Sequence, residues 1–431
     1  MGRPKTGVTH GDFSRYSSQS HTVRGVFLIR FRHHSLIFFL LLISVSACAV
    51  EWPQWFGPNR DGNILVKNWE PEFAKQGPEL LWRFRAGIGY SPVSVQDGLA
   101  FTMGYQDGED VVYCLDAETG EEKWSYSYPC GIHDFQHEGG PACAPLIENG
   151  LVYTMSRDCD AFCFNAKTGD IVWSASAQAN IHPATPLFGY IGAPAMVGDR
   201  LILDVGAIVA LDKKSGERIW QSEETFKATC SSPTPFELDG KSYAAVFNAT
   251  GLVIVDVETG HERWRKPWQT PAFDTNTGTP LVKGNRIFIT SGFDGGAALL
   301  ELGEDHEPKV VWEDQDLRSR NNTPRLYEDH LYYFDIDTLR CLEFETGKEK
   351  WSEDWIGVGT SILVNNCLLT LSERGEVVFV EATPEEYREL GRFHLMGGTC
   401  WTPPAFAENK LYLRNSKGHV SCFDMRPLTK L

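Results

Sequence analysis

The sequence lacks the features that place a chain in a bilayer or on a nucleic acid. After residue 50, no apolar run approaches the roughly 20 residues that span a membrane. Positive charge is scarce, with 40 Lys and Arg against 57 Asp and Glu, and there is no basic stripe. The formal net charge is −17, and since residues 1–50 contribute +5, the remainder carries −22. Such an acidic body is repelled by phosphate groups, which argues against nucleic acids and anionic membranes as partners.

Several catalytic and metal-binding signatures are also missing. The sequence contains neither a G-x-S-x-G nucleophile motif nor a phosphate-binding loop, so a hydrolase has no support. The loop Cys130–Cys143 mixes His, Asp, Glu and Cys, but its spacing matches no standard zinc site. It is not H-E-x-x-H either, because Glu138 follows the second histidine. We therefore assign no metal site and interpret this loop as a polar loop.

The first fifty residues have the character of an export signal. Three arginines precede a fifteen-residue apolar run, Leu36–Val50, which suits a signal-peptide core. Near its end, Val-Ser-Ala-Cys resembles a bacterial lipobox with Cys48 as the lipidated residue. The alternatives are an ordinary signal peptide cleaved after Ala49 and an uncleaved anchor. Each interpretation exports the body, so we expect a bacterial periplasmic protein or outer-membrane lipoprotein that contacts membrane only through residues 1–49.

A repeated unit fills the rest of the chain. Its clearest form is an Asp-x-x-Thr-Gly turn followed by Trp, and alternating apolar residues flank it. Alternation is typical of strands, and Gly supplies the positive φ of a tight turn. The polar turn residue recurs eight times at spacings of 38–49 residues, at Asp116, Asn165, Asp212, Asp256, Glu301, Glu343, Glu381 and Asp424. Units of this length predict the four-stranded blades of a propeller, with the periodic carboxylates as turn caps.

The eighth unit lacks a Trp strand, whereas Leu80–Phe84 supplies one before the first unit. We predict that this strand pairs with the strand ending near Asp424. The expected fold is all-β: an eight-bladed β-propeller of four-stranded antiparallel blades over residues 76–426, closed by the N-terminal strand. Residues 50–75 form an N-terminal extension, and residues 427–431 form a tail.

Two other residue types share one position per unit. Seven tryptophans are predicted to pack between blades: Trp82, Trp124, Trp173, Trp220, Trp264, Trp312 and Trp351. Four cysteines occupy a position where other units have apolar residues, and are predicted to be small core residues: Cys114, Cys163, Cys341 and Cys422. Among the remaining cysteines, Cys130–Cys143 is the one disulfide that we predict.

The units resemble the PQQ-like repeat, which builds quinoprotein dehydrogenases and the propeller lipoprotein of the outer-membrane β-barrel assembly machine. The segment Trp52–Gly62 resembles the leader of a large bacterial group of exported propellers of this kind. The family implies either a scaffold or a PQQ-dependent dehydrogenase of alcohols or sugars, with calcium. Two markers of the dehydrogenases, a Cys-Cys pair and a C-x-x-C-H haem site, do not occur. We therefore expect a non-catalytic propeller that serves as an envelope or outer-membrane assembly scaffold, and we assign PQQ with calcium only to the dehydrogenase alternative.

The loops that precede the innermost strand of each blade return the chain from the rim to the axis, so they converge at one end of the channel. We expect them to bind a protein or a small molecule there. In the quinone alternative, Trp401 is a stacking platform and Arg318 and Arg320 grip carboxylates. The candidate binding residues are His133, Asp134, His137, His182, Asp274, Asn276, Arg318, Arg320, Asn321, Asn322 and Trp401.

Overall fold

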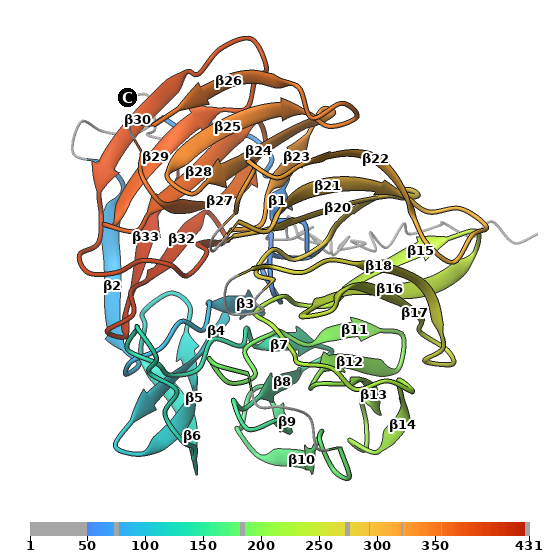
Figure 1. Cartoon of the computed structure of the whole chain (residues 1–431). Helices are drawn as coiled ribbons and strands as arrows, with labels where there is room; N and C mark the ends of the chain where they lie inside the picture. The colour runs from blue at the N-terminus through green and yellow to red at the C-terminus, as the bar shows by residue number, and fades with distance from the viewer. Residues whose placement is uncertain are drawn as a thin grey trace, which may run out of the picture. The chain divides into compact units, whose positions relative to one another are not determined.

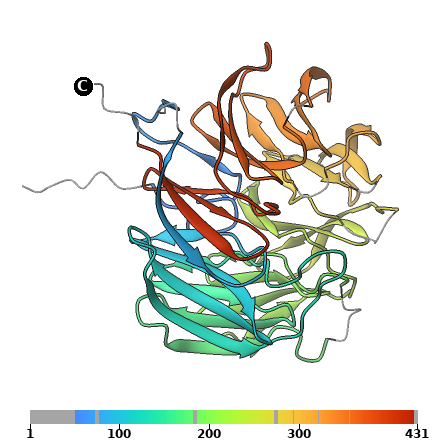
Figure 2. The ribbon, with the colours of Figure 1, turned by 90° about the vertical axis from the view of Figure 1, so that its left-hand side faces the viewer.

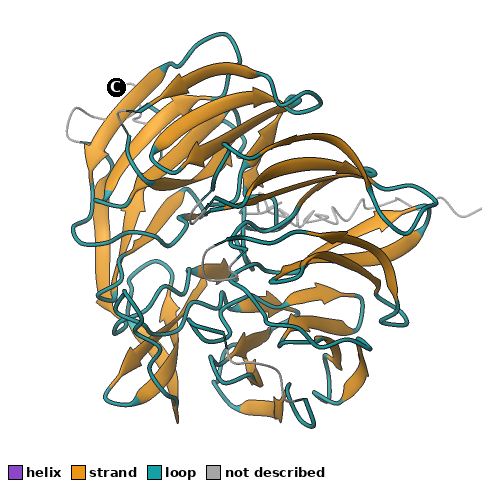
Figure 3. Ribbon diagram, viewed as in Figure 1, coloured by secondary structure: helices purple, strands orange, loops and turns teal. Residues whose placement is uncertain are grey.

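The computed structural model describes residues 50–72, 77–181, 186–271, 276–292, 294–319, 322–354 and 356–426. In these ranges every regular element is a β-strand, as Figure 3 shows. The candidate residues His182, Asp274, Arg320, Asn321 and Cys48 lie outside the described residues, as does the whole export signal. Over the described ranges, no helix has the length and apolar character to cross a membrane.

The strands form eight sheets, each with a four-stranded antiparallel blade, which we number as blades 1 to 8 (Figure 1). One of them has β1 (Asn63–Ile64) as a fifth, parallel strand. From the innermost strand outward, blades 1 to 4 are as follows: β3 (Ser94–Gln96), β4 (Leu99–Gln106), β5 (Glu109–Asp116) and β6 (Glu122–Pro129); β7 (Leu146–Glu148), β8 (Leu151–Met155), β9 (Asp160–Asn165) and β10 (Ile171–Ser176); β11 (Ala195–Val197), β12 (Arg200–Asp204), β13 (Ile208–Asp212) and β14 (Arg218–Gln221); β15 (Thr234–Leu238), β16 (Lys241–Asn248), β17 (Gly251–Asp256) and β18 (Glu262–Pro267).

Blades 5 to 8 continue the ring in the same order: β19 (Leu281–Lys283), β20 (Arg286–Ser291), β21 (Gly296–Glu301) and β22 (Lys309–Asp314); β23 (Arg325–Tyr327), β24 (His330–Asp335), β25 (Thr338–Glu343) and β26 (Glu349–Glu353); β27 (Gly359–Val364), β28 (Cys367–Ser372), β29 (Glu376–Glu381) and β30 (Glu389–His394); β31 (Ala405–Ala407), β32 (Lys410–Arg414), β33 (His419–Asp424) and β2 (Glu79–Arg85). The expected all-β, eight-bladed propeller is confirmed.

The predicted closure of the ring is also confirmed. β2 is the outermost strand of blade 8 and pairs antiparallel with β33, with Leu80 opposite Phe423 and Trp82 opposite Cys422. Figure 2 shows the blue β2 beside the red end of the chain. Because β2 comes from the start of the repeat region, blade 8 joins residues that are more than 300 positions apart in the sequence.

The seven periodic tryptophans join neighbouring blades, as predicted. Each indole N–H donates to a backbone carbonyl in the turn of the next blade, as Trp173 does to Lys213 at 2.9 Å. The same pattern links Trp82, Trp124, Trp220, Trp264, Trp312 and Trp351 to Ala117, Ala166, Val257, Gly303, Phe344 and Thr383. The turn Gly216 has φ +73°, and a Cβ there would lie 2.5 Å from the Trp173 ring. Glycine at this turn therefore provides both the backbone conformation and the space for the indole.

Most turn residues and cysteines follow their predictions. The exceptions are the disulfide and three glutamates, which bond the side chains of Arg286, Thr346 and Arg388 instead: Glu301, Glu343 and Glu381. Asp116 and Asp212 each accept two backbone N–H groups of their own turns, so they are turn caps. The four periodic cysteines are fully buried core residues. The predicted Cys130–Cys143 disulfide is wrong, because both are free thiols buried at separate positions of one apolar cluster. An even cysteine count suggested pairing, but burial alone accounts for these thiols.

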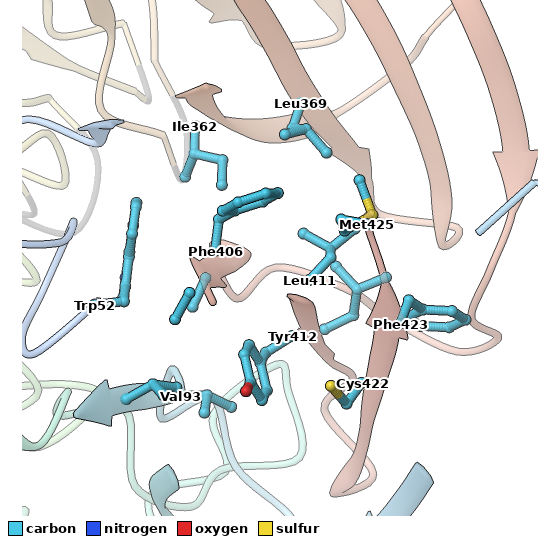
Figure 4. Close-up of a cluster of buried hydrophobic side chains, with 14 of the residues drawn as sticks. Trp52, Val93, Ile362, Leu369, Phe406, Leu411, Tyr412, Cys422, Phe423 and Met425 are labelled. Carbon is cyan, nitrogen blue, oxygen red and sulfur yellow. The ribbon is translucent and has the colours of Figure 1, made fainter. Parts of the chain in front are cut away.

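The N-terminal extension runs inside the ring of innermost strands and bonds to every blade. β1 (Asn63–Ile64) pairs parallel with β27, next to the axis. Around the ring, the bonded partners in blades 1 to 8 are Val95, Ile147, Pro194, Pro233, Thr279, Leu326, Leu363 and Met425. Trp52 is 1% exposed and belongs to the largest apolar cluster, near Phe406 and Ile362 (Figure 4). The extension thus occupies the channel.

Candidate functional site

A cavity of about 200 Å³ lies at the end of the channel where the innermost strands begin. We call this end the mouth, and the loops that lead into the innermost strands the mouth loops. The mouth loops of seven blades line the cavity, with Tyr90, Phe135, Phe188, Cys230, Thr277, Thr323 and Trp401 among their residues. These loops therefore converge at one end of the channel, as the blade topology predicts.

Two residues of the N-terminal extension form the floor of the cavity. Trp55 donates its indole N–H to Thr279 Oγ1 at 3.1 Å, and Phe56 adjoins it with ring centroids 4.4 Å apart. The Arg325 guanidinium stacks on Phe56, 3.9 Å from the ring centroid. The turn requires Gly57 at φ +77°, because a Cβ there would lie 2.9 Å from the Trp52 ring. The extension therefore both fills the channel and shapes the binding cavity.

Aromatic rings build one wall of the cavity. Tyr90 and Trp401 stack with centroids 5.7 Å apart and an interplanar angle of 16°. His137 meets Tyr90 edge-on at 5.5 Å and contacts Phe188 at 5.1 Å. The Tyr90 hydroxyl donates to Glu138 at 2.7 Å, and the Trp401 indole N–H donates to Glu373 at 3.3 Å. These bonds fix the two stacked rings from behind.

The titratable groups in the lining are uncharged at neutral pH. Burial lowers the pKa of His137 below its ordinary value. Burial, together with the bonded Glu138 carboxylate, raises the pKa of Tyr90, and burial raises the pKa of Cys230 to about 12. Although burial favours its protonated form, bonds from Tyr90 and Ser416 hold the pKa of Glu138 below its usual value. The cavity itself is therefore neutral, with an anionic carboxylate behind one wall.

The surface around the cavity is acidic. The described mouth loops lie at the same end of the channel as the turns between the second and third strands of each blade. Eleven acidic residues face five basic ones there: Asp107, Asp134, Glu138, Asp158, Glu223, Glu224, Asp294, Asp316, Asp337, Asp354 and Glu373 against Arg157, Lys227, Arg318, Arg374 and Lys417. A basic partner would be attracted to this end.

The predicted site residues divide into three groups. Of the described ones, His137 and Trp401 line the cavity. Three others lie in the loops around the cavity: His133, Asp134 and Arg318. There His133 Nε2 is 3.8 Å from Asp158 Oδ1, and Arg318 Nη1 is 3.4 Å from Asp294 Oδ1.

The third group is buried in the framework. Asn276 is fully buried, accepts a bond from Thr270 and donates to Asn248, so its amide supports the loop and does not reach the cavity. Asn322 is 3% exposed, and neither amide atom has a hydrogen-bond partner in the described part of the chain.

Sequence reasoning missed most of the rings. Trp55 and Phe56 belong to an extension that has no repeat pattern, so only the folded path reveals their position. Tyr90 carried a usable signal: Tyr90-Ser-Pro occupies the same place before blade 1 as Trp401-Thr-Pro does before blade 8. An alignment of these two starts predicts a pair of neighbouring aromatic residues, because blades 8 and 1 are adjacent.

The residues that the structure describes do not fit PQQ with calcium. Calcium takes about six to eight oxygen ligands, including carboxylates. The cavity lining offers threonine hydroxyls and the Gln136 amide but no carboxylate, and no group of three His, Cys, Asp or Glu side chains in the described ranges could hold a metal ion. Arg318, a candidate partner for quinone carboxylates, is already paired with Asp294 and Asp335.

Fold and cavity together define a closed eight-bladed propeller with PQQ-like blades and an aromatic cavity at one end of its channel. A family model described as outer membrane protein assembly factor BamB matches residues 72–203 and 111–353. These matches cover more than half of the chain, which therefore belongs to this BamB-like family.

Individual relatives agree with this assignment. BamB of Alteromonas naphthalenivorans is 28% identical over 54% of this chain and 56% of that protein, so the chain spans little more than half of that relative. BamB of Burkholderia pseudomallei is 25% identical over 81% of this chain and 88% of that protein.

Solved structures share the fold. BamB from Moraxella catarrhalis superposes with a TM-score of 0.61 at 16% identity, covering 80% of this chain and 99% of that one. Quinohemoprotein alcohol dehydrogenase from Comamonas testosteroni gives 0.61 at 14% identity, covering 89% and 81%. At these identities the likeness shows the fold alone, and the fold does not separate scaffold from enzyme.

Proposed function

We propose that this chain is an exported, non-catalytic propeller that binds a protein partner at the mouth and acts in outer-membrane protein assembly. The observation that carries the proposal is the aromatic cavity with an apolar rim. Ile132 and Phe135 of the blade 2 mouth loop are each 41% exposed, beside a cavity lined by rings. Exposed aromatic and aliphatic side chains next to a concave site are typical of protein-binding surfaces.

The chemistry of the lining supports binding over catalysis. General acid–base catalysis needs groups whose pKa values lie near the working pH. Burial instead keeps Cys230 protonated and His137 neutral, and Tyr90 is bonded to Glu138. None of these three groups is an activated nucleophile or a poised acid–base pair. The BamB relatives, whose name describes outer membrane protein assembly, supply the cellular role.

The path of the extension supports a particular orientation. The Val50 carbonyl accepts a bond from the Glu408 N–H, and Glu51 accepts bonds from Gln96 and Asp97. These residues lie at the ends of the innermost strands, opposite the mouth. Two residues span at most about 7 Å, so a lipid on Cys48 would hold this far end at the membrane and direct the mouth into the periplasm.

The proposal is tested by photocrosslinking in cells. A photoreactive residue at Phe135, at the mouth, should crosslink to a discrete component of the outer-membrane assembly machinery. The matched control is Leu65, which is also apolar, is 82% exposed and lies next to the far-end residue Asn365. Crosslinking from Leu65 and not from Phe135 would mean that the partner binds the opposite end.

The alternative is a PQQ-dependent dehydrogenase of alcohols or sugars, which would share the fold and use Trp401 as the quinone platform. Because the described lining lacks both a calcium donor set and a cationic side chain for quinone carboxylates, we do not favour it. Titration with PQQ and calcium should therefore give no saturable absorbance change. Saturable uptake together with alcohol oxidation would establish the alternative.

A further inference from the structure

Resting on the proposed function, we propose that the mouth cavity is a socket for one aromatic side chain of the partner, and that basic residues flank this side chain. The partner is thereby described by its chemistry: an uncharged ring that enters the cavity, and positive charge that meets the surrounding loops.

The cavity favours a ring by its size and lining. Its volume of about 200 Å³ lies below the roughly 300–1,000 Å³ of pockets that take drug-sized ligands, so it suits a single side chain or a small molecule. Trp55 and Phe56 supply aromatic surface at the floor, and Tyr90 and Trp401 supply it at the wall. A ring among rings gains edge-to-face or offset contacts in addition to the burial of apolar area. Tyrosine and tryptophan are also the side chains most often found as central anchors of protein interfaces.

A cation inside the cavity is disfavoured by the two buried arginines next to its floor and wall. The fully buried Arg325 already covers one face of Phe56, at 3.9 Å. Arg414, also buried, donates to the carbonyls of Gly89 and Ser91 on either side of Tyr90. In a low-dielectric interior, a second cation against these rings would be repelled. One face of Phe56 is therefore already taken by a cation, and its other face remains available to a neutral ring.

An anion inside the cavity is disfavoured for a different reason. The guanidinium groups behind the rings donate to backbone carbonyls, as Arg325 does to Thr323, and the described lining offers no cationic side chain. Two carboxylates, Glu138 and Glu373, are bonded to the lining rings Tyr90 and Trp401. Burying an unpaired negative charge beside them costs free energy that no contact repays.

The flanking charge follows from the loops outside the cavity. Eleven acidic residues against five basic ones lie at this end of the described chain. Several are exposed, among them Asp134 and Asp294. These residues lie in water and not against the buried arginines, so they attract basic residues next to the anchor and raise the association rate at low salt.

The test uses four short acetylated, amidated peptides and the exported protein from Val50 onward, with binding measured by isothermal titration calorimetry. Lys-Trp-Lys should bind. Lys-Ala-Lys, which lacks the ring, should bind at least tenfold more weakly. Glu-Trp-Glu should also bind more weakly than Lys-Trp-Lys, and the difference should shrink in high salt. In the fourth peptide, Lys-Arg-Lys, the ring is replaced by a cation, and it should resemble Lys-Ala-Lys.

Two variants with opposite effects on the cavity locate the binding. Trp401→Ala removes a ring, whereas Ala142→Phe fills the cavity without removing one. Each should weaken Lys-Trp-Lys at least tenfold, and Leu65→Ala at the far end should not. Thermal unfolding verifies that both variants fold. If one variant does not fold, the affinity of the other for Lys-Trp-Lys still tests whether the peptide binds in the cavity.

The socket proposal would be overturned if Lys-Ala-Lys or Lys-Arg-Lys bound as tightly as Lys-Trp-Lys. It would also be overturned if folded Ala142→Phe bound Lys-Trp-Lys as tightly as the unchanged protein does. If no peptide binds while Phe135 still crosslinks to a partner, the socket is wrong and the proposed function stands. If the crosslink fails as well, both are wrong.

Discussion

Single residues hold the ring together through one interaction repeated between blades. In blade 2, the Trp173 indole donates to the Lys213 carbonyl at 2.9 Å and lies against Gly216 of the next turn. The ring is 7% exposed, so the interaction adds apolar burial to a buried hydrogen bond. Four other tryptophans make the same pair of contacts, so this position is more constrained than its neighbours on the same strand: Trp82, Trp124, Trp220 and Trp312.

The first prediction concerns this position. Trp173→Ala should lower the free energy of unfolding by about 3–5 kcal/mol, because it leaves a cavity at a blade junction and an unpaired carbonyl. The matched control is Ile171→Ala on the same strand, since Ile171 is 42% exposed. That variant should change stability by less than about 0.5 kcal/mol. Equal effects of the two substitutions in chemical denaturation would place Trp173 outside the core.

The second prediction concerns a buried carboxyl group. Asp204 is 5% exposed, its Oδ1 accepts only the Gly206 N–H, and its Oδ2 has no partner in the described chain. Burial raises the pKa of Asp204 to about 7. Because the folded state then binds a proton that the unfolded state has already lost, stability should fall as pH rises from about 4 to about 7. Asp204→Asn should remove about 2–4 kcal/mol of this fall.

Asp212→Asn is the control, because the contribution of Asp212 to stability depends on pH with the opposite sign. Bonds from the backbone of Ser215 and Lys214 lower the pKa of Asp212, so its contribution is present above the unfolded pKa of about 4 and is lost as pH falls through its folded pKa. Unfolding free energies of the three proteins across pH 3–8 separate the two effects. Parallel pH curves for wild type and Asp204→Asn would show that Asp204 is not buried as described.

At the level of elements, predictability from sequence depended on whether the contact was periodic. The turn at Asp116 and the Trp strand at Trp124 recur in most units, so their roles were readable from spacing. The absence of a Trp strand in the last unit identified β2. The extension has no counterpart in the repeats. The contacts of Trp55 with Thr279 and of Asn63 with Leu326 join residues more than 220 positions apart, and no local pattern encodes them.

The same reasoning explains the partial prediction of the mouth. The topology of a blade determines where its mouth loop lies, and this placed His137 and Trp401 correctly at one end. Whether a loop side chain faces the cavity depends on its neighbours: Asn276 turns inward because Thr270 and Asn248 satisfy its amide. Loop composition alone carries no such information.

The third prediction tests the closing strand. Replacing Glu79–Arg85 with a Gly/Ser linker of equal length should lower the melting temperature and broaden the transition, because blade 8 loses its outer strand and β33 becomes an exposed edge. The control is Leu80→Ala alone, since Leu80 is 36% exposed and its removal leaves the pairing of β2 intact. An unchanged, cooperative transition in the linker variant would show that ring closure does not depend on β2.

On the scale of the whole molecule, the channel has two different ends. The mouth carries the aromatic cavity, whereas at the far end the chain enters through Val50 and Glu51. An eight-residue strand such as β4 rises about 25 Å, so the two ends are separated by about this distance. A chain tethered by its N-terminus should therefore present the mouth away from the tether.

The fourth prediction follows from this polarity and from the proposed lipid on Cys48. A dye on Leu65→Cys, at the far end, should be quenched by a quencher in the bilayer, whereas a dye on Phe135→Cys should not be, because Phe135 lies at the mouth about 25 Å farther out. Both labelled variants carry Cys230→Ser, since all ten described cysteines are free and Cys230 alone among them is not buried. Cys48→Ser should release the protein from membranes and abolish the quenching at Leu65→Cys. If the dye at Phe135→Cys is quenched and the dye at Leu65→Cys is not, the mouth faces the membrane and the partner must bind elsewhere. If Cys48→Ser leaves the protein membrane-bound, the tether is an uncleaved signal and not a lipid.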